Sequence, residues 1–201
     1  MADPALTWDA ATGRYRRSDG RFISRAAVRR EVDTSLANVV RLTDTLADDL
    51  RAGRISLNQW REEMRAVIKA AQMGPSAIAA GGYDQMTQAD FGRVGQRIRR
   101  EYQYLEQWVE QIKGGLPIDN RMESRSRQYL RSGRTTFLAL ESQDMADRGF
   151  LARSVLRPAE HCAACIAEAD KGLVPVDQIV PPGQRTCLSN CRCFLVYERA
   201  A

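Results

Sequence analysis

The first 160 residues contain no cysteine and no histidine, and the whole chain of 201 residues has only three lysines. No apolar run approaches the roughly 18 residues that a membrane-spanning helix requires. The N-terminal segment "MADPALTWDAATGRYRR" lacks the apolar stretch of a secretory signal. These absences predict a protein that is made in a reducing cytoplasm and has no membrane partner. In that compartment clustered thiols more often bind metal than form disulfides.

The patterns that mark common catalytic centres are also missing. The sequence has no glycine-rich phosphate-binding loop and no set of His, Asp and Glu with the spacing of a hydrolytic metal site. The glycines of "GGYDQMTQADFGRVG" do not follow the Gly-x-Gly-x-x-Gly order. We therefore predict that the protein is not an enzyme.

Basic residues outnumber acidic ones by 30 to 25, which gives a net charge of +5, and 27 of the basic residues are arginines. Arginine makes planar, bidentate contacts with phosphate and carboxylate groups. One interpretation is therefore a nucleic acid or an acidic protein as partner. The alternative is a GC-rich genome that encodes basic residues with arginine codons.

On the fourth expected helix, two pairs of arginines have the four-residue spacing that places side chains on one face of a helix. The pairs are Arg121 with Arg125 and Arg127 with Arg131. Such faces can follow a phosphate backbone and bind nucleic acid without sequence preference. They can equally pair with acidic faces of other helices or of another subunit. No aromatic residues alternate with them to stack on bases.

Residues 24–149 have the periodicity of an α-helical body, with apolar side chains at every third or fourth position. Four long helices are expected, each beginning at a residue that can cap a helix N-terminus. The capping residues are Ser24, Ser56, Thr87, and Asp119 or Asn120. Gln59 and Asp90 stand where the second and third of these helices would complete a capping box.

Glycine and proline set the expected ends of these helices. The ends are Gly53, Met73-Gly74-Pro75, Gly114-Gly115 and a position near Gly149. Gly133 is expected to interrupt the fourth helix. The segment "PSAIAAGGYDQM" after the second helix is predicted to be a connector with at most two helical turns.

Two segments flank this body. Residues 1–23 repeat a Gly-Arg-aromatic unit and are predicted to form an extended N-terminal arm, which lies along a neighbour or is disordered. Residues 150–201 form a cysteine-rich module with short strands expected in "FLARSVLRP" and "CFLVYER". This module has too little apolar sequence to fold alone. The predicted fold class is mainly α, with about four long helices and a small C-terminal module that contains short β-strands and is held together by zinc.

All five cysteines and the only histidine lie within "HCAACIAEADKGLVPVDQIVPPGQRTCLSNCRC", residues 161–193. Cys162 and Cys165 have the Cys-x-x-Cys spacing of a metal-binding turn, and Cys187, Cys191 and Cys193 follow as a second group. Thiolates from two separated turns can complete the tetrahedral coordination that zinc prefers. We predict one zinc ion with four of these five cysteines as ligands. His161, beside Cys162, is a weaker candidate.

Three other chemistries remain open for this segment. Two disulfides with one free thiol would suit an oxidising medium, although the odd number of cysteines argues against a purely disulfide framework. Redox catalysis by Cys-x-x-Cys requires a helix N-terminus in a β-α-β setting, whereas this segment is predicted to be a proline-rich loop. A nucleophilic cysteine with His161 as its base is disfavoured because adjacent residues rarely point at each other.

The C-terminal sequence resembles the end of tailed-phage head morphogenesis proteins of the Mu-F-like minor head family. The matching pieces are Cys162 and Cys165, Gly172 to Pro175, and Asn190-Cys191-Arg192-Cys193. The segments "TGRYRRSDGRFIS" and "GRISLNQWREEM" are also similar to parts of phage-encoded relatives. Many relatives have His-Pro before Asn-Cys-Arg-Cys, whereas this chain has Leu188-Ser189, with Cys187 one position earlier. Cys187 is therefore expected to take the place of the histidine as a ligand.

This resemblance implies a structural virion protein: a minor head, portal-associated or head–tail connector protein. Its implied partners are the phage portal and capsid proteins and packaged DNA, within an oligomeric assembly. Its implied role is in head assembly, DNA packaging or DNA exit, first in the host cytoplasm and then in the virion. No enzymatic activity is implied. The alternative function is a zinc-ribbon-like nucleic-acid-binding protein that uses its arginine-rich helices.

Overall fold

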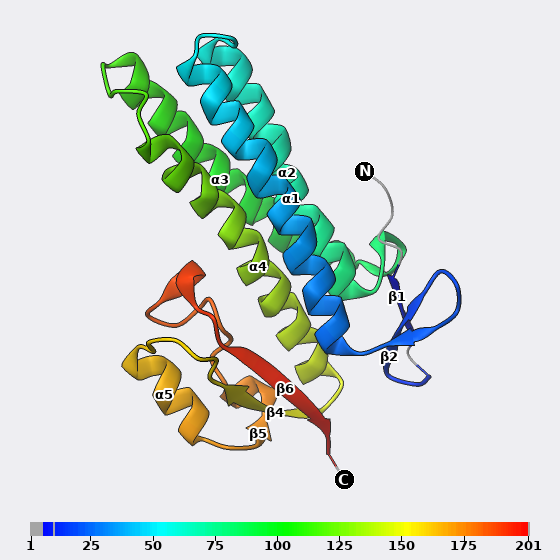
Figure 1. Ribbon diagram of the computed structural model, residues 1–201. Helices are drawn as coiled ribbons and strands as arrows, with labels where there is room; N and C mark the ends of the chain where they lie inside the picture. Colours follow the sequence, from blue (N-terminus) through cyan, green and yellow to red (C-terminus); the bar gives the residue numbers. More distant parts are fainter. Residues whose placement is uncertain (1–5, 10, 201) are drawn as a thin grey trace. The chain divides into compact units, whose positions relative to one another are not determined.

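The computed structural model describes residues 6–9 and 11–200, and its fold is mainly α, as predicted (Figure 1). The chain divides into two compact units, residues 1–133 and 134–201. The division lies inside helix α4 (Arg121–Asp147), and not at residue 150 where the sequence predicts the start of the cysteine-rich module. Within the described residues no helix has both the length and the apolar composition needed to cross a bilayer.

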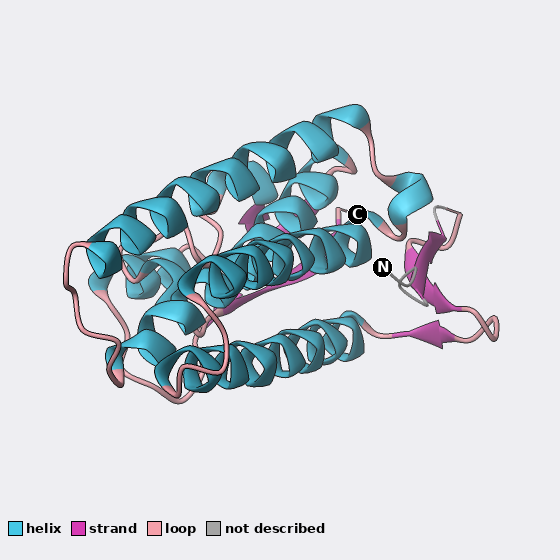
Figure 2. Cartoon of the chain, turned by 90° about the horizontal axis from the view of Figure 1, so that it is seen from above, coloured by secondary structure: helices cyan, strands magenta, loops and turns pink. Residues whose placement is uncertain are grey.

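Three long helices form most of the first unit. They are α1 (Arg25–Arg51), α2 (Leu57–Ala80) and α3 (Gln88–Lys113), and α2 packs against both of the others. The three helices lie side by side in Figures 1 and 2. The predicted caps of the first three helices are confirmed: Ser24 accepts a hydrogen bond from a backbone N–H at the start of α1, and α2 and α3 each begin with a complete capping box.

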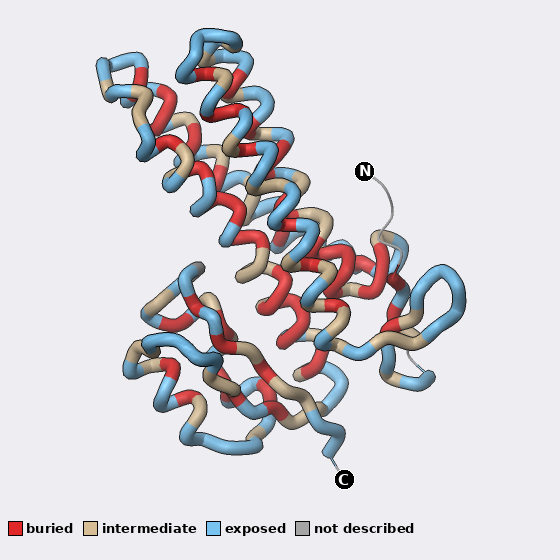
Figure 3. The backbone as a smooth tube through the Cα atoms, in the orientation of Figure 1, coloured by how far each residue is buried: buried red, intermediate tan, exposed pale blue. Residues whose placement is uncertain are grey.

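The core of this unit is built from the apolar stripes of the helices, which appear in Figure 3 as recurring buried positions. Trp60 of α2 and Trp108 of α3 are almost completely buried and meet edge to face, with ring centroids 5.0 Å apart. Tyr129 of α4 stacks on Trp108 at 6.2 Å. Aromatic pairs of this kind add about 0.5–1.5 kcal/mol to the stability that comes from burial alone.

The sequence predicts that α2 ends at Met73-Gly74-Pro75, but this prediction is wrong. The helix continues to Ala80 with Pro75 in its interior. Residues 76–80 of the predicted connector are therefore helical. A proline inside a helix leaves the carbonyl four residues earlier without its usual N–H donor, and here that carbonyl belongs to Ala71. Packing against other helices can compensate for the loss of this hydrogen bond.

Helix α4 passes this point of α2 at Gly133, where the sequence predicts an interruption and the structure has continuous helix. A Cβ atom at Gly133 would overlap the carbonyl oxygen of Ala71. Next to this contact, the side chain of Gln72 donates a buried hydrogen bond of 2.6 Å to Ser132. Gly133 is thus a close-packing residue and not a helix breaker.

Part of the predicted N-terminal arm, residues 1–23, forms an antiparallel sheet with the order β1 (Leu6–Asp9), β2 (Arg14–Arg17), β3 (Phe22–Ile23). The sheet is anchored to the C-terminal end of α2. Tyr15 is buried and donates a hydrogen bond of 3.0 Å to the carbonyl of Ala79, and the backbone of Trp8 bonds to Gly81. The short helix η1 (Tyr83–Gln85) follows α2 in the chain. The described part of this segment is therefore folded, and not extended as predicted.

The second unit combines the last turns of α4 with a small three-stranded sheet. The strand order is β5 (Val174–Pro175), β4 (Phe150–Val155), β6 (Phe194–Arg199), and both pairings are antiparallel. The two longer strands confirm the predictions made from "FLARSVLRP" and "CFLVYER". Helix α5 (Ala163–Asp170) packs on β4, and the short helices η2 (Val176–Gln178) and η3 (Leu188–Asn190) lie in the connections.

Candidate metal centre

The antiparallel pair of β4 and β6 brings the two halves of the cysteine segment together. Cys162 is the N-cap residue of α5 and Cys165 lies in the first turn of this helix. Cys187 and Cys191 flank η3, and Cys193 directly precedes β6. Because β6 pairs with β4 along its whole length and α5 packs on β4, the second group of thiols is carried to the first turn of α5.

The five sulfur atoms form one cluster. The Sγ atom of Cys165 lies 3.5 Å from that of Cys187 and 3.6 Å from that of Cys191. Two ligand groups can be distinguished, Cys162–Cys165–Cys187 and Cys165–Cys191–Cys193, and within each group the ligand atoms lie within 4.8 Å of one another. Cys165, Cys191 and Cys193 are buried, whereas Cys162 and Cys187 are partly exposed. These groups can hold a metal ion.

The separations suit metal coordination better than covalent bonding. Two sulfurs on one tetrahedral zinc ion, each about 2.3 Å from the metal, are about 3.8 Å apart. A disulfide would require about 2.05 Å. All five thiols are free.

Comparison with known proteins identifies no relative. No family, curated protein or solved structure matches.

Burial and hydrogen bonding divide the thiols into two kinds. The backbone N–H of Cys165 stabilises the thiolate of Cys162 and lowers the pKa of that thiol to about 7. Burial acts in the opposite direction at Cys193 and raises its pKa to about 12, and burial likewise raises the pKa of Cys187. Without a cation, several of these thiols therefore retain their protons. A bound cation would favour the thiolate form of each of its ligands.

A buried arginine, Arg185, supplies positive charge beside the cluster. Its side chain is only 3% exposed and donates through Nε to the carbonyl of Val180 and through Nη1 to the hydroxyl of Ser154, at 2.8 and 2.9 Å. Burial raises the pKa of Cys165, and the neighbouring Cys187 thiol and the Arg185 guanidinium oppose that effect. No sequence pattern marks Arg185, because an arginine in a proline-rich connection is usually exposed.

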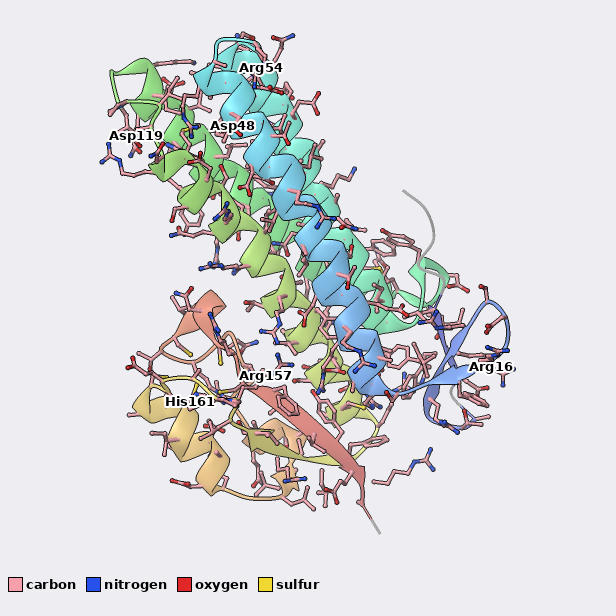
Figure 4. All side chains as sticks on the ribbon, viewed as in Figure 1. Arg16, Asp48, Arg54, Asp119, Arg157 and His161 are labelled. Carbon is pink, nitrogen blue, oxygen red and sulfur yellow. The ribbon has the colours of Figure 1, made fainter. Side chains whose placement is uncertain are left out.

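His161 also faces the cluster, although it is only half-buried. Its Nε2 atom lies 2.6 Å from the carbonyl oxygen of Arg157, and its Nδ1 atom lies 3.6 Å from the sulfur of Cys193. A carbonyl can only accept, so Nε2 carries a proton, and Nδ1 faces Cys193. His161 and Arg157 are both labelled in Figure 4.

The Cys-x-x-Cys pair lies at the N-terminus of a helix, and not in a proline-rich loop as predicted. The predicted loop setting of Cys162 and Cys165 is therefore wrong. The required setting is still absent, because α5 connects the antiparallel strands β4 and β5, whereas a β-α-β unit joins parallel strands. Cys165 is also closely surrounded by two other thiols, which favours a shared cation over one exchanging pair.

A cavity of about 280 Å³ opens beside the cluster. Its lining includes His161, Cys162, Cys187 and Cys191. The ligand groups therefore adjoin a space through which an ion can enter.

The predicted nucleic-acid-binding arginines lie on α4, and each of them interacts with other groups of the protein. Arg127 makes two hydrogen bonds with the carboxylate of Asp44, at 2.9 and 2.8 Å. Arg125 donates to Gln111 and covers the ring of Trp108.

Arg121 bonds to Asp119 in the turn before α4, and Arg131 is exposed. The structure thus favours the interpretation in which these arginines pair with other groups of the protein. Their contact with nucleic acid remains a prediction.

Proposed function

We propose that this chain is a structural protein of a tailed-phage head, of the minor head, portal-associated or connector kind, and that zinc binds its C-terminal module. The observation that carries the proposal is the convergence of five thiols, from separate segments, on one cluster inside a module of few apolar residues. The resemblance of the Asn-Cys-Arg-Cys end to the Mu-F-like family supplies the phage setting.

Zinc suits this cluster because it prefers thiolate and imidazole ligands in tetrahedral geometry and has no redox chemistry of its own. Four of the five cysteines are enough to hold one ion. Ligation would contribute directly to the folding free energy of the module, since its apolar core is small. The bound metal would have a structural role, with no catalytic step assigned to it.

A rigid module of this kind would serve as a docking element for portal and capsid proteins during head assembly in the host cytoplasm, and would remain in the virion. Leu188 supports such a role. It is 62% exposed and has φ of 47°, a backbone conformation that is unfavourable for leucine. A leucine held in such a strained backbone conformation is the point at which we expect contact with a partner.

The proposal is tested by co-expressing the full chain with the portal and capsid proteins encoded by the same genome. We expect the chain to co-purify with assembled heads at low copy number, and we expect Cys165→Ser to reduce this incorporation strongly. Gly92→Ala, on the exposed side of α3, serves as the matched control and should leave incorporation unchanged.

A chain that never enters heads, and that binds duplex DNA alone with a steep dependence on salt concentration, would instead support the nucleic-acid-binding alternative.

A further inference from the structure

The cysteine cluster contains more ligands than one tetrahedral ion can use. Four thiolates complete such an ion, and the cluster has five thiols together with an imidazole nitrogen that faces one of them. If one ion is bound by four of the thiols, the fifth thiol and the oriented His161 are not ligands. Both features need an explanation.

The geometry points to a centre with two divalent ions, in which Cys165 and Cys191 bridge the metals. In this arrangement Cys162 and Cys187 are the terminal ligands of the first ion. Cys193 and His161 Nδ1 are the terminal ligands of the second. Each ion then has four ligands, and all six donors are used. This inference rests on the proposed zinc-binding function and extends it to a second ion.

The distances between the sulfur atoms support this division. The two groups of three ligands share Cys165, as expected if that thiolate lies between the metals. The other inferred bridge, Cys191, lies 3.6 Å from Cys165 and belongs to the group that contains Cys193, a ligand of the second ion. Its thiol interacts with that of Cys187, which places it near the ligands of both ions. The two bridging candidates are buried, as is the terminal ligand Cys193 of the second ion, whereas the terminal ligands Cys162 and Cys187 of the first ion are partly exposed.

His161 has the environment of a metal ligand. A nitrogen and a sulfur bound to one tetrahedral zinc ion are about 3.6 Å apart, and the separation of Nδ1 and the Cys193 sulfur is 3.6 Å. Histidine ligands usually donate their other ring N–H to a carbonyl or carboxylate, which fixes the ring. The bond from Nε2 to the Arg157 carbonyl provides this support.

The charge balance also favours two ions. Four thiolates around one divalent ion leave two negative charges, of which the buried Arg185 can offset only one. Five thiolates around two divalent ions leave a single negative charge, which matches the one buried guanidinium. Because uncompensated buried charge is strongly destabilising, the second arrangement suits this site better.

The test is the metal content of the full chain, purified anaerobically from zinc-supplemented cells, together with zinc-edge X-ray absorption spectroscopy. We expect two zinc ions per chain and a zinc–zinc scattering path, which arises only if the ions share ligands. One ion per chain would overturn the inference and leave the proposed zinc-binding function intact. No bound zinc in a folded, reduced chain would overturn both.

Variants identify the ligands of the second ion. His161→Gln and Cys193→Ser are each expected to reduce zinc from two ions to one per chain. Glu160→Gln, next in sequence and lining the same cavity, is the control and should retain two. If a variant fails to fold, cadmium-113 NMR of the unaltered chain decides. It should show two resonances, one from a site with four sulfur ligands and one from a site with three sulfurs and one nitrogen. A single resonance would contradict the inference.

Discussion

At the scale of single residues, Pro75 and Gly133 have linked roles. Proline frees the carbonyl of Ala71 from the hydrogen-bond pattern of α2, and glycine lets the backbone of α4 approach that carbonyl closely. Each residue would be unfavourable in an isolated helix. Together they create one close helix crossing, so their helix propensities alone give the wrong prediction at both positions.

Replacing Gly133 with alanine is therefore expected to destabilise the protein, although alanine is the better helix former. The new Cβ atom would overlap the Ala71 oxygen, and such overpacking costs about 1–3 kcal/mol. Urea unfolding of the full chain measures the change. Gly92→Ala on α3 is the control, because its Cβ meets no atom within 4 Å. The control should be neutral or stabilising by up to about 1 kcal/mol, and equal behaviour of the two variants would contradict this account of the crossing.

Cys162 provides a second prediction at this scale. The pKa of this thiol is lowered to about 7, whereas that of Cys193 is raised to about 12. In the metal-free, reduced protein, iodoacetamide should modify Cys162 before the other cysteines. The rate of this alkylation should rise with pH through a midpoint near pH 7. A lowered thiol pKa also means that Cys162 contributes stability to the metal-free form above its ordinary pKa of 9.0. That contribution is lost as the pH falls through 7.

Peptide mapping by mass spectrometry identifies the modified residue. Cys162→Ser should remove the reaction at neutral pH and leave the slower sites unchanged. Modification of Cys193 before Cys162 would show that the first turn of α5 does not activate its thiol.

At the scale of elements, the helix starts follow local rules. Thr87 and Asp90 satisfy each other's backbone N–H groups at the beginning of α3, and Ser56 with Gln59 does the same for α2. Partial burial opposes ionisation of Asp90, but hydrogen bonds from Thr87 and from Arg93 hold its pKa below the ordinary value. These starts were predictable because a capping box depends on residues only three positions apart.

Thr87→Ala should cost about 1 kcal/mol, the usual effect of losing an N-cap. Thr87→Ser keeps the hydroxyl and should cost much less, so it is the matched control in the same unfolding measurement. Because the pKa of Asp90 is lowered in the folded state, its contribution is present at neutral pH and is lost as the pH falls through that lowered value. The difference in the free energy of unfolding between the unaltered protein and Thr87→Ala should therefore become smaller in acid.

At the scale of the whole molecule, the two compact units depend on different interactions. The first unit has a continuous apolar core around Trp60 and Trp108. The second is held together by its small sheet, the cysteine cluster and the buried polar contacts of Arg185 and Glu168. Loss of metal should therefore affect the two units unequally.

We expect a strong chelator to increase amide hydrogen exchange in residues 150–200 by at least tenfold, while the amides of α2 and α3 stay protected. Adding zinc back under reducing conditions should restore protection. The comparison between the two regions is internally controlled, since both belong to one chain. If the chelator reduced protection equally in both regions, or in neither, the metal would not stabilise the second unit specifically.

The sequence alone determined the features that depend on near neighbours or on residue type. The helix starts, the mainly α fold and the two long strands of the module follow from caps and periodicity, and the five cysteines marked the candidate site. Tertiary structure decided the rest. The continuation of α2 through Pro75, the folding of the N-terminal segment onto α2, and the places of Arg185 and His161 beside the thiols all depend on distant contacts. Such contacts leave no local pattern in the sequence, because the groups that meet are far apart along the chain and each is ordinary in its own neighbourhood.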